Sequence, residues 1–214
     1  MGKNLTDQAI YIIKNAIVMG DLKLGEAISE IGICDKYNLS KTPVREALVI
    51  LSHEGLVNKI SRKGCFVFDI TINEIEEIAE LRFLLEEYAI KKSINNNKKE
   101  FINNLNNIFA EMENASSKND FLKYLEIDTK FHNAFFDYSD NKHLTDSYKK
   151  LSGKVEALRF YVVKKSIEDG EGLKSHRSIL DAIINEDYSN LSVNLNKHMI
   201  LWLNKYKFDF KIGL

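Results

Sequence analysis

Four residues in the second half of the chain have types and spacings suited to metal binding. Asp128 and His132 are four positions apart, so both side chains lie on one face if the segment is helical. His176 and His198 lie equally far from Asp187. An antiparallel helical hairpin that turns there would bring both imidazoles to one height, on the order of 15 Å from the turn at ~1.5 Å per residue.

One carboxylate and three imidazoles form a donor set that suits zinc or another first-row divalent ion, with water or a ligand completing the shell. An i, i+4 pair of this kind also arises by chance in helices. The spacing by itself therefore leaves a second interpretation equally open, in which Asp128, His132, His176 and His198 are ordinary core or surface residues.

Arg82 interrupts an otherwise apolar stripe. The stripe recurs at helical spacing and consists of Ile75, Ile78, Leu85 and Ala89. The guanidinium is therefore expected to point into the interior, where a cation needs an anionic partner. Glu86, four residues later, can supply that partner as an ordinary intrahelical ion pair.

Basic residues gather between Ser40 and Phe66, although the whole chain has a formal net charge of −1. The segment has two acidic residues, Glu46 and Glu54, and its basic residues are Lys41, Arg45, Lys59, Arg62 and Lys63. A cluster of this size is usually only a solvated face. It indicates nucleic-acid binding only if the elements around it have a DNA-binding layout.

The first 69 residues have such a layout, three short helices followed by a β-hairpin. Apolar periodicity, capping serines and glycine stops place the helices at Leu5–Met19, Ser29–Tyr37 and Ser40–Gly55. Pro43 fits the first turn of the third helix, where its missing N–H has no intrahelical partner to lose. The following segment LVNKISRKGCFVFDI predicts a hairpin around the basic turn Ser61–Gly64. This order is that of a winged helix-turn-helix.

The remainder of the chain, residues 70–214, is predicted to be an antiparallel bundle of six helices. It holds no proline and few glycines, and its apolar residues keep helical spacing. The expected helices cover about 71–94, 100–116, 119–138, 142–167, 173–185 and 188–208. The fold class is therefore mainly α, with a small β-hairpin wing in the first domain.

The composition is that of an ordinary globular protein, with 44% hydrophobic and 29% charged residues. No apolar run is long enough to span a membrane, and the N-terminus lacks a signal-peptide core. We therefore expect a cytoplasmic protein. Cys34 and Cys65 form no CxxC pair, which argues against a disulfide framework and against a cysteine-rich zinc site.

The segment SKTPVREALVILSHEGLVNKISRKGCFV resembles the helix-turn-helix and wing of the GntR family of transcription regulators. The match covers about 28 consecutive residues, including the Pro-Val-Arg-Glu-Ala-Leu run, the Glu-Gly-Leu and the wing glycine. The resemblance implies DNA contacts from Ser40, Lys41, Thr42, Arg45, Arg62, Lys63 and Gly64. The alternative for the helix is an ordinary core helix in which Arg45 pairs with a nearby acid.

The expected contacts have a physical basis. Arg45, one turn into its helix, can reach a guanine edge with its two-pronged guanidinium, and the helix N-terminus can meet phosphate. Gly64 lets the wing approach the duplex, while Arg62 and Lys63 can track phosphates or enter the minor groove. Lys41 stands where the family usually has arginine, so it keeps the charge but loses bidentate geometry.

The arrangement DTKFH, then SHRSILDAI, then KHM resembles the FCD domain, the C-terminal domain carried by many GntR regulators. In that domain an Asp and three His bind a metal, and they match Asp128, His132, His176 and His198. Six helices resemble the shorter, VanR-like branch. The resemblance also implies that Arg82 faces an effector pocket, so that an effector carboxylate is an alternative to Glu86. His143 matches no ligand position.

Together these features predict a DNA-binding regulator, not an enzyme. A small organic acid at the metal and Arg82 would shift the geometry of a homodimer on a pseudo-palindromic operator. Zinc is the first expectation for the metal, with nickel, iron or manganese as alternatives, and repression is expected from family habit. Two other hypotheses are a metal sensor and a metal-dependent hydrolase or oxygenase. The latter lacks an HExxH-like base motif and leaves the DNA-binding segment unexplained.

Overall fold

The computed structural model describes residues 4–212, except for the side chains of Lys164, Lys165 and residues 208–212. The chain forms two compact units. One contains the chain up to Thr71 together with Lys149–Phe160, and the other contains Ile72–Tyr148 and the chain from Tyr161 onward. The helix α6 (Lys142–Glu168) therefore contributes to both units.

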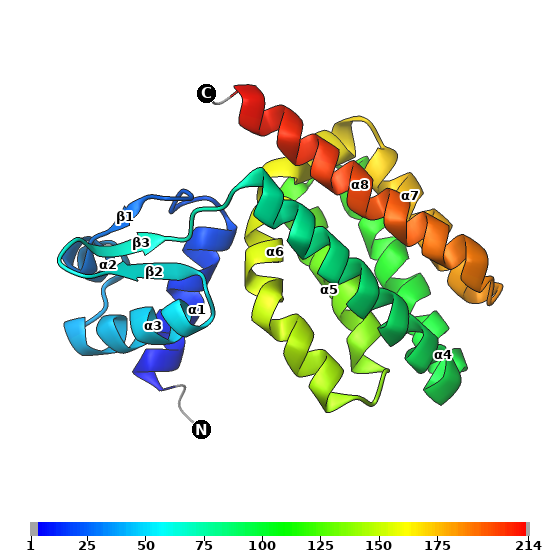
Figure 1. Cartoon of the computed structure of the whole chain (residues 1–214), viewed down its shortest axis with the longest axis horizontal. Coiled ribbons are helices and arrows are strands. Elements are labelled where there is room, and N and C mark those ends of the chain that lie inside the picture. Colours follow the sequence, from blue (N-terminus) through cyan, green and yellow to red (C-terminus); the bar gives the residue numbers. More distant parts are fainter. Residues whose placement is uncertain (1–3, 213–214) are drawn as a thin grey trace. The chain divides into compact units, whose positions relative to one another are not determined.

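The first unit is a winged helix-turn-helix, as the sequence predicts (Figure 1). Its helices are α1 (Leu5–Val18), α2 (Glu30–Tyr37) and α3 (Lys41–His53). Its strands are β1 (Ala27–Ile28), β2 (Val57–Ile60) and β3 (Gly64–Val67), which form an antiparallel sheet in the order β1-β3-β2. The hairpin β2–β3 was expected. The two-residue β1 was not, because it is too short to carry a periodic pattern.

Local signals fix most of these elements. The Ser29 side chain caps α2 by accepting a 3.1 Å hydrogen bond from the Gly32 amide. Ser40 stands at the cap position of α3, but the expected side-chain capping bond is not among those of the described residues. Pro43 lies buried in the first turn of α3, as predicted. The core between the helices is apolar and includes Ile13, Ile17, Leu48 and Leu51, each at most 1% exposed.

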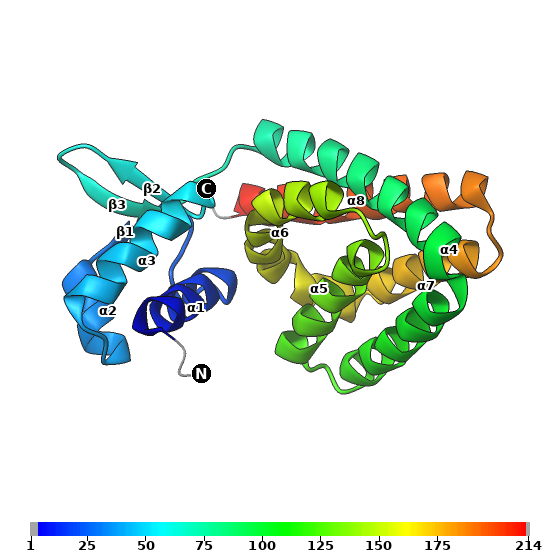
Figure 2. The same cartoon turned by 90° about the horizontal axis from the view of Figure 1, so that it is seen from below.

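The second unit is built from α4 (Ile72–Ser117), α5 (Phe121–Asp137), α6, α7 (Glu171–Ile184) and α8 (Tyr188–Ile212). The break predicted at Asn95–Lys99 is a kink, because only Asn97 leaves helical geometry. With the two halves of α4 taken separately, the described helices correspond to the predicted six. Figure 2 shows α7 and α8 as the expected hairpin beside α4.

The core of the second unit is rich in phenylalanine. Phe101, Phe131 and Phe135 are fully buried, and the rings of Phe131 and Phe135 meet edge to face at 5.2 Å. Phe131 also contacts the rings of His132 and His176, at 5.8 and 5.1 Å. The aromatic core therefore forms one wall of the site at which the predicted metal ligands meet.

No helix in the described part of the chain combines the length and the apolar character needed to cross a membrane. Cys34 and Cys65 are both free thiols at partly exposed positions.

Candidate metal centre and DNA-contacting surface

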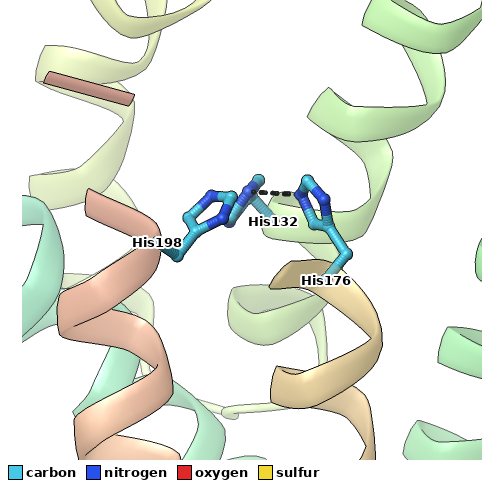
Figure 3. A group of neighbouring side chains, drawn as sticks. All are labelled: His132, His176 and His198. Carbon is cyan, nitrogen blue, oxygen red and sulfur yellow. Dashed lines mark hydrogen bonds between the residues drawn. The ribbon is translucent and has the colours of Figure 1, made fainter. Parts of the chain in front are cut away.

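Three histidines from three different helices converge inside the second unit (Figure 3). His132 comes from α5, His176 from α7 and His198 from α8. One ring nitrogen from each lies within 4.8 Å of the others. The ring centres of His176 and His198 are 4.6 Å apart and the rings meet edge to face, so the helical hairpin does bring these two residues together.

Asp128 adds a carboxylate to this cluster. Its Oδ1 lies 2.9 Å from Nε2 of His176, and its residue is 8% exposed. The histidines are equally buried, at 0% for His132, 2% for His176 and 8% for His198. The three histidines that the sequence singles out as metal ligands therefore meet in one buried place, and the fourth residue, Asp128, contacts one of them, His176.

Each histidine has its Nδ1 engaged by a group outside the cluster. His132 Nδ1 lies 2.9 Å from Glu86 Oε2, and His198 Nδ1 lies 3.0 Å from Ser175 Oγ. His176 Nδ1 donates to the Gly172 carbonyl at 2.7 Å. Partners of this kind fix the ring orientation and leave Nε2 for a metal. The cluster thus has the donor set and the outer hydrogen bonds of a three-histidine, one-carboxylate centre for a first-row divalent ion.

The surroundings of His198 favour its uncharged imidazole form. Burial lowers the pKa of His198 well below its ordinary value, and the neighbouring His176, His132 and Arg82 lower it further. Neutral imidazole is the form that ligates metals. The surroundings therefore keep His198 in the form that a metal requires.

Arg82 reaches the same cluster from α4. Its Nε donates to Glu86 Oε1 at 2.6 Å, and the pair is fully buried. The structure thus contains the intrahelical partner that the sequence suggested. Nη2 of Arg82 also lies 3.0 Å from His132 Nε2. A metal ion held by Nε2 would compete with Arg82 for one lone pair, so metal binding requires Arg82 Nη2 to give up this contact.

Two aromatic residues near the cluster were missed by the sequence analysis. Tyr124 lies one turn before Asp128 on α5, and Trp202 lies one turn after His198 on α8. Among the described residues, neither Tyr124 Oη nor Trp202 Nε1 has a hydrogen-bond partner, although both are buried. Burial, and then Asp128, raises the pKa of Tyr124. The four-residue spacing from a proposed ligand was the signal that could have found both.

The residues expected to touch DNA form an exposed surface on the first unit. Ser40, Lys41, Thr42, Arg45, Arg62, Lys63 and Gly64 are all exposed. Ser40 is the N-cap residue of α3, and Lys41, Thr42 and Arg45 lie in its first turns. Arg62 and Lys63 lie in the turn between β2 and β3, and Gly64 begins β3; Arg62 and Gly64 have φ values of 64° and 107°. Only glycine adopts the latter freely. His53 and His143 are exposed as well and take no part in the histidine cluster.

Arg45 is paired with an acid, the alternative considered for this position. Its Nε lies 2.7 Å from Glu30 Oε2, while 67% of the Arg45 side chain remains exposed. Ion pairs between exposed side chains contribute little, about 0 to 1 kcal/mol. The Glu30 contact therefore does not prevent Arg45 from turning to a DNA base.

The chain thus combines a winged helix-turn-helix with a helical unit that contains a buried histidine cluster. This combination is typical of a two-domain DNA-binding regulator. The chain belongs to the GntR family of bacterial regulatory proteins, in the group that carries an FCD domain. The match to "Bacterial regulatory proteins, gntR family" covers residues 5–67, and the match to "FCD domain" covers residues 77–200. Proteins of this family are transcription regulators and not enzymes, as the sequence predicts.

Relatives of known name agree with this assignment. The chain is 26% identical over 172 residues to the uncharacterized HTH-type transcriptional regulator YdhC of Bacillus subtilis, covering 80% of this chain and 77% of the relative. It is 24% identical over 193 residues to the gluconate operon transcriptional repressor of the same organism, covering 88% and 79%.

Solved structures share the fold. McbR/YncC of E. coli has a TM-score of 0.83 at 19% identity, covering 98% of this chain and 100% of that one. A putative GntR regulator from Rhodococcus sp. RHA1 has a TM-score of 0.76 at 18% identity, covering 94% and 96%. At these identities the likeness concerns the fold alone.

Removing one histidine from the cluster tests whether it holds metal. His176→Ala or His198→Ala removes one nitrogen donor and leaves the other ligands poorly oriented. The affinity of the protein for the metal should therefore fall by at least about tenfold. Elemental analysis of purified protein after dialysis without a strong chelator measures this. His143→Ala, at an exposed position outside the cluster, is the matched control. Equal metal content in the wild-type protein and the three variants, or no divalent metal in any of them, would rule out the site.

Proposed function

We propose that the protein is a homodimeric transcription repressor whose affinity for its operator is controlled by a small carboxylate effector at a metal centre. Membership of the GntR family establishes that the protein is a DNA-binding transcription regulator. The observation that carries the rest is the convergence of Asp128 and three histidines, each histidine with its Nδ1 held from outside. Zinc suits this donor set best, and nickel, iron or manganese are alternatives.

The charges around the cluster favour an anionic effector. A divalent ion there would add its positive charge to that of the buried guanidinium of Arg82. The negative charges nearby would be the carboxylates of Asp128 and Glu86. With both carboxylates ionised, an excess positive charge would remain in a place that excludes water. Uncompensated buried charge is costly, so a ligand that brings a negative charge is favoured. The effector carboxylate would then bind the metal and Arg82 together.

The nature of the relatives supports repression, and the geometry of DNA supports a dimer. Several relatives are named as repressors, among them those of the gluconate operon and of a probable D-xylose utilization operon. A single recognition helix makes few base contacts, whereas two helices related by a twofold axis read both halves of a pseudo-palindromic operator. The effector would change operator affinity by favouring one dimer geometry, with the protein acting on DNA in the cytoplasm.

The assignment of roles within the chain follows the same reasoning. Residues 1–69 would bind DNA, and residues 70–214 would bind the effector and form the dimer. At the start of α3, Arg45 would read a base edge while Ser40, Lys41 and Thr42 contact the backbone beside it. In the wing, Arg62, Lys63 and Gly64 would follow phosphates or enter the minor groove.

A second candidate function is a regulator that senses the metal itself. It is favoured by one contact, the 3.0 Å approach of Arg82 Nη2 to His132 Nε2, because a metal at that nitrogen would displace Arg82 without any organic ligand. In this case the metal alone would change operator affinity. The two candidates share the same site and differ only in what is sensed.

Separate titrations of operator affinity distinguish these functions. An operator selected from random DNA is bound to full-length protein, and either a divalent metal alone or an organic acid at fixed metal is then added. The proposed function predicts that an acid weakens binding by about 5- to 150-fold, the usual range of coupling between two sites, and that metal alone does not. A response to metal alone would favour the sensor. No response to either would contradict both.

Arg45→Ala tests the recognition helix. Loss of a bidentate base contact should weaken specific binding by about 1 to 3 kcal/mol per half-site, toward non-specific affinity, with helix content and dimerisation unchanged. Gel-shift assays on the selected operator and on unrelated DNA measure the ratio. Glu30→Ala is the control, because it removes the Arg45 partner and should leave operator binding intact or stronger. Unchanged specificity in Arg45→Ala would remove this assignment.

Lys63→Ala tests the wing. A phosphate contact releases a counterion whatever the base sequence, so its loss should weaken specific and non-specific binding alike and lower the salt slope by about 0.9. Binding measured over a series of salt concentrations gives this slope. A loss confined to the specific operator would contradict a phosphate-binding role for Lys63.

A further inference from the structure

Two buried N–H groups beside the histidine cluster make no hydrogen bond to any residue that the structure describes. They are Nη1 of Arg82 and Nε1 of Trp202. Arg82 is 0% exposed and Trp202 is 6% exposed, so neither group is in bulk water. A buried donor left unsatisfied costs free energy, and native proteins leave few of them. Two such donors in one place indicate an acceptor that binds there.

The side chains that carry the two donors are neighbours. The guanidinium carbon of Arg82 is 5.8 Å from the centre of the Trp202 ring. Arg82 uses Nε for Glu86 and Nη2 for His132, so Nη1 is the remaining nitrogen of the fork. Trp202 follows His198 by one helical turn on α8. The pair therefore lies directly beside the candidate metal centre.

The chemistry of the two groups defines their ligand. An indole N–H and a guanidinium both donate hydrogen bonds and neither can accept one. Their partner must offer acceptor atoms, and the charge of Arg82 favours an anion. We propose that Trp202 is an effector-binding residue, and that its indole N–H and Arg82 Nη1 together receive one carboxylate group of the effector. This rests on the proposed function, and it adds a residue that selects for a carboxylate.

Tyr124 does not share this role. Its hydroxyl can accept as well as donate, so it does not discriminate between ligand types. Its hydroxyl also lies close to Gly172 on α7, because a Cβ atom built onto Gly172 would lie 3.2 Å from Tyr124 Oη. Tyr124 is thus associated with α7, whereas the donor pair is formed by α4 and α8.

The selectivity that follows is for a carboxylate over its amide. An amide of the same shape presents an N–H group to one of the two donors, which leaves that donor unsatisfied and places two donors face to face. Sites built from buried hydrogen-bonding groups discriminate strongly against ligands that leave those groups unpaired. Acetate and acetamide, which share one shape, are therefore suitable probes.

The single tryptophan of the chain makes the test direct, because full-length protein labelled with ¹⁵N has one indole N–H resonance. Acetate is titrated at constant ionic strength against chloride, with and without Zn²⁺, and acetamide is titrated in parallel. Acetate should move the indole proton resonance downfield in a saturable manner, and acetamide should not. No movement with acetate, or an equal movement with acetamide, would overturn the proposal.

A pair of variants completes the test. Trp202→Phe keeps one aromatic ring and removes the N–H together with the five-membered ring that carries it, so acetate should bind about 10- to 100-fold more weakly, as expected for a lost hydrogen bond to a charged group. The affinity for acetate is measured from thermal stabilisation, in which the melting curve of each protein with acetate is compared with its own curve without acetate. Tyr124→Phe removes another buried donor and should bind acetate like the wild type. Equal stabilisation of all three proteins would overturn the role of Trp202.

The outcomes separate this proposal from effector control of the operator. If acetate moves the indole resonance but no acid changes operator affinity, the carboxylate site stands and the effector function fails. If an acid releases the operator while the indole resonance and the Trp202→Phe affinity stay unchanged, the effector function stands and the role of Trp202 fails.

Discussion

The arrangement of the second unit depends on how the buried guanidinium of Arg82 is neutralised. Glu86 meets it at 2.6 Å with one carboxylate oxygen and holds His132 Nδ1 at 2.9 Å with the other. Removal of one partner from a fully buried pair typically costs about 3 to 5 kcal/mol, because the other charge is left uncompensated. The pair is therefore weak evidence for added stability, but it fixes α4 against α5 in one register and sets the orientation of His132.

In the same unit, packing as well as charge holds the candidate ligand side chains in fixed orientations. Phe131 contacts two of the histidine rings edge to face, while Gly172 and Ser175 hold the Nδ1 atoms of His176 and His198. Ligand groups held in advance on helices lose little freedom when an ion binds. Arg82 Nη2 lies 3.0 Å from His132 Nε2, so in the proposed function a metal at His132 and the guanidinium of Arg82 would compete for the same nitrogen.

The surface proposed to contact DNA is exposed, in contrast to the buried cluster. The one close ion pair there, Arg45 with Glu30, lies at the surface where such pairs contribute little. Side chains of this kind gain most of their binding energy only when phosphate or base groups replace water. In the proposed function, the coupling free energy between the buried cluster and this surface would be about 1 to 3 kcal/mol, the usual size of coupling between two binding sites.

The sequence by itself determined the helices, the wing and most of the candidate site, because apolar periodicity, caps and equal spacing from Asp187 are local signals. It did not determine that Asn97 only kinks α4, that Ser40 makes no capping bond, or that β1 pairs with β3. Only the tertiary structure decided that Glu86 serves Arg82 and His132 together and that Trp202 stands beside them. Spacing along a helix fixes which side chains share a face, but the rotation and contact of one helix against another depend on packing between residues far apart in the chain.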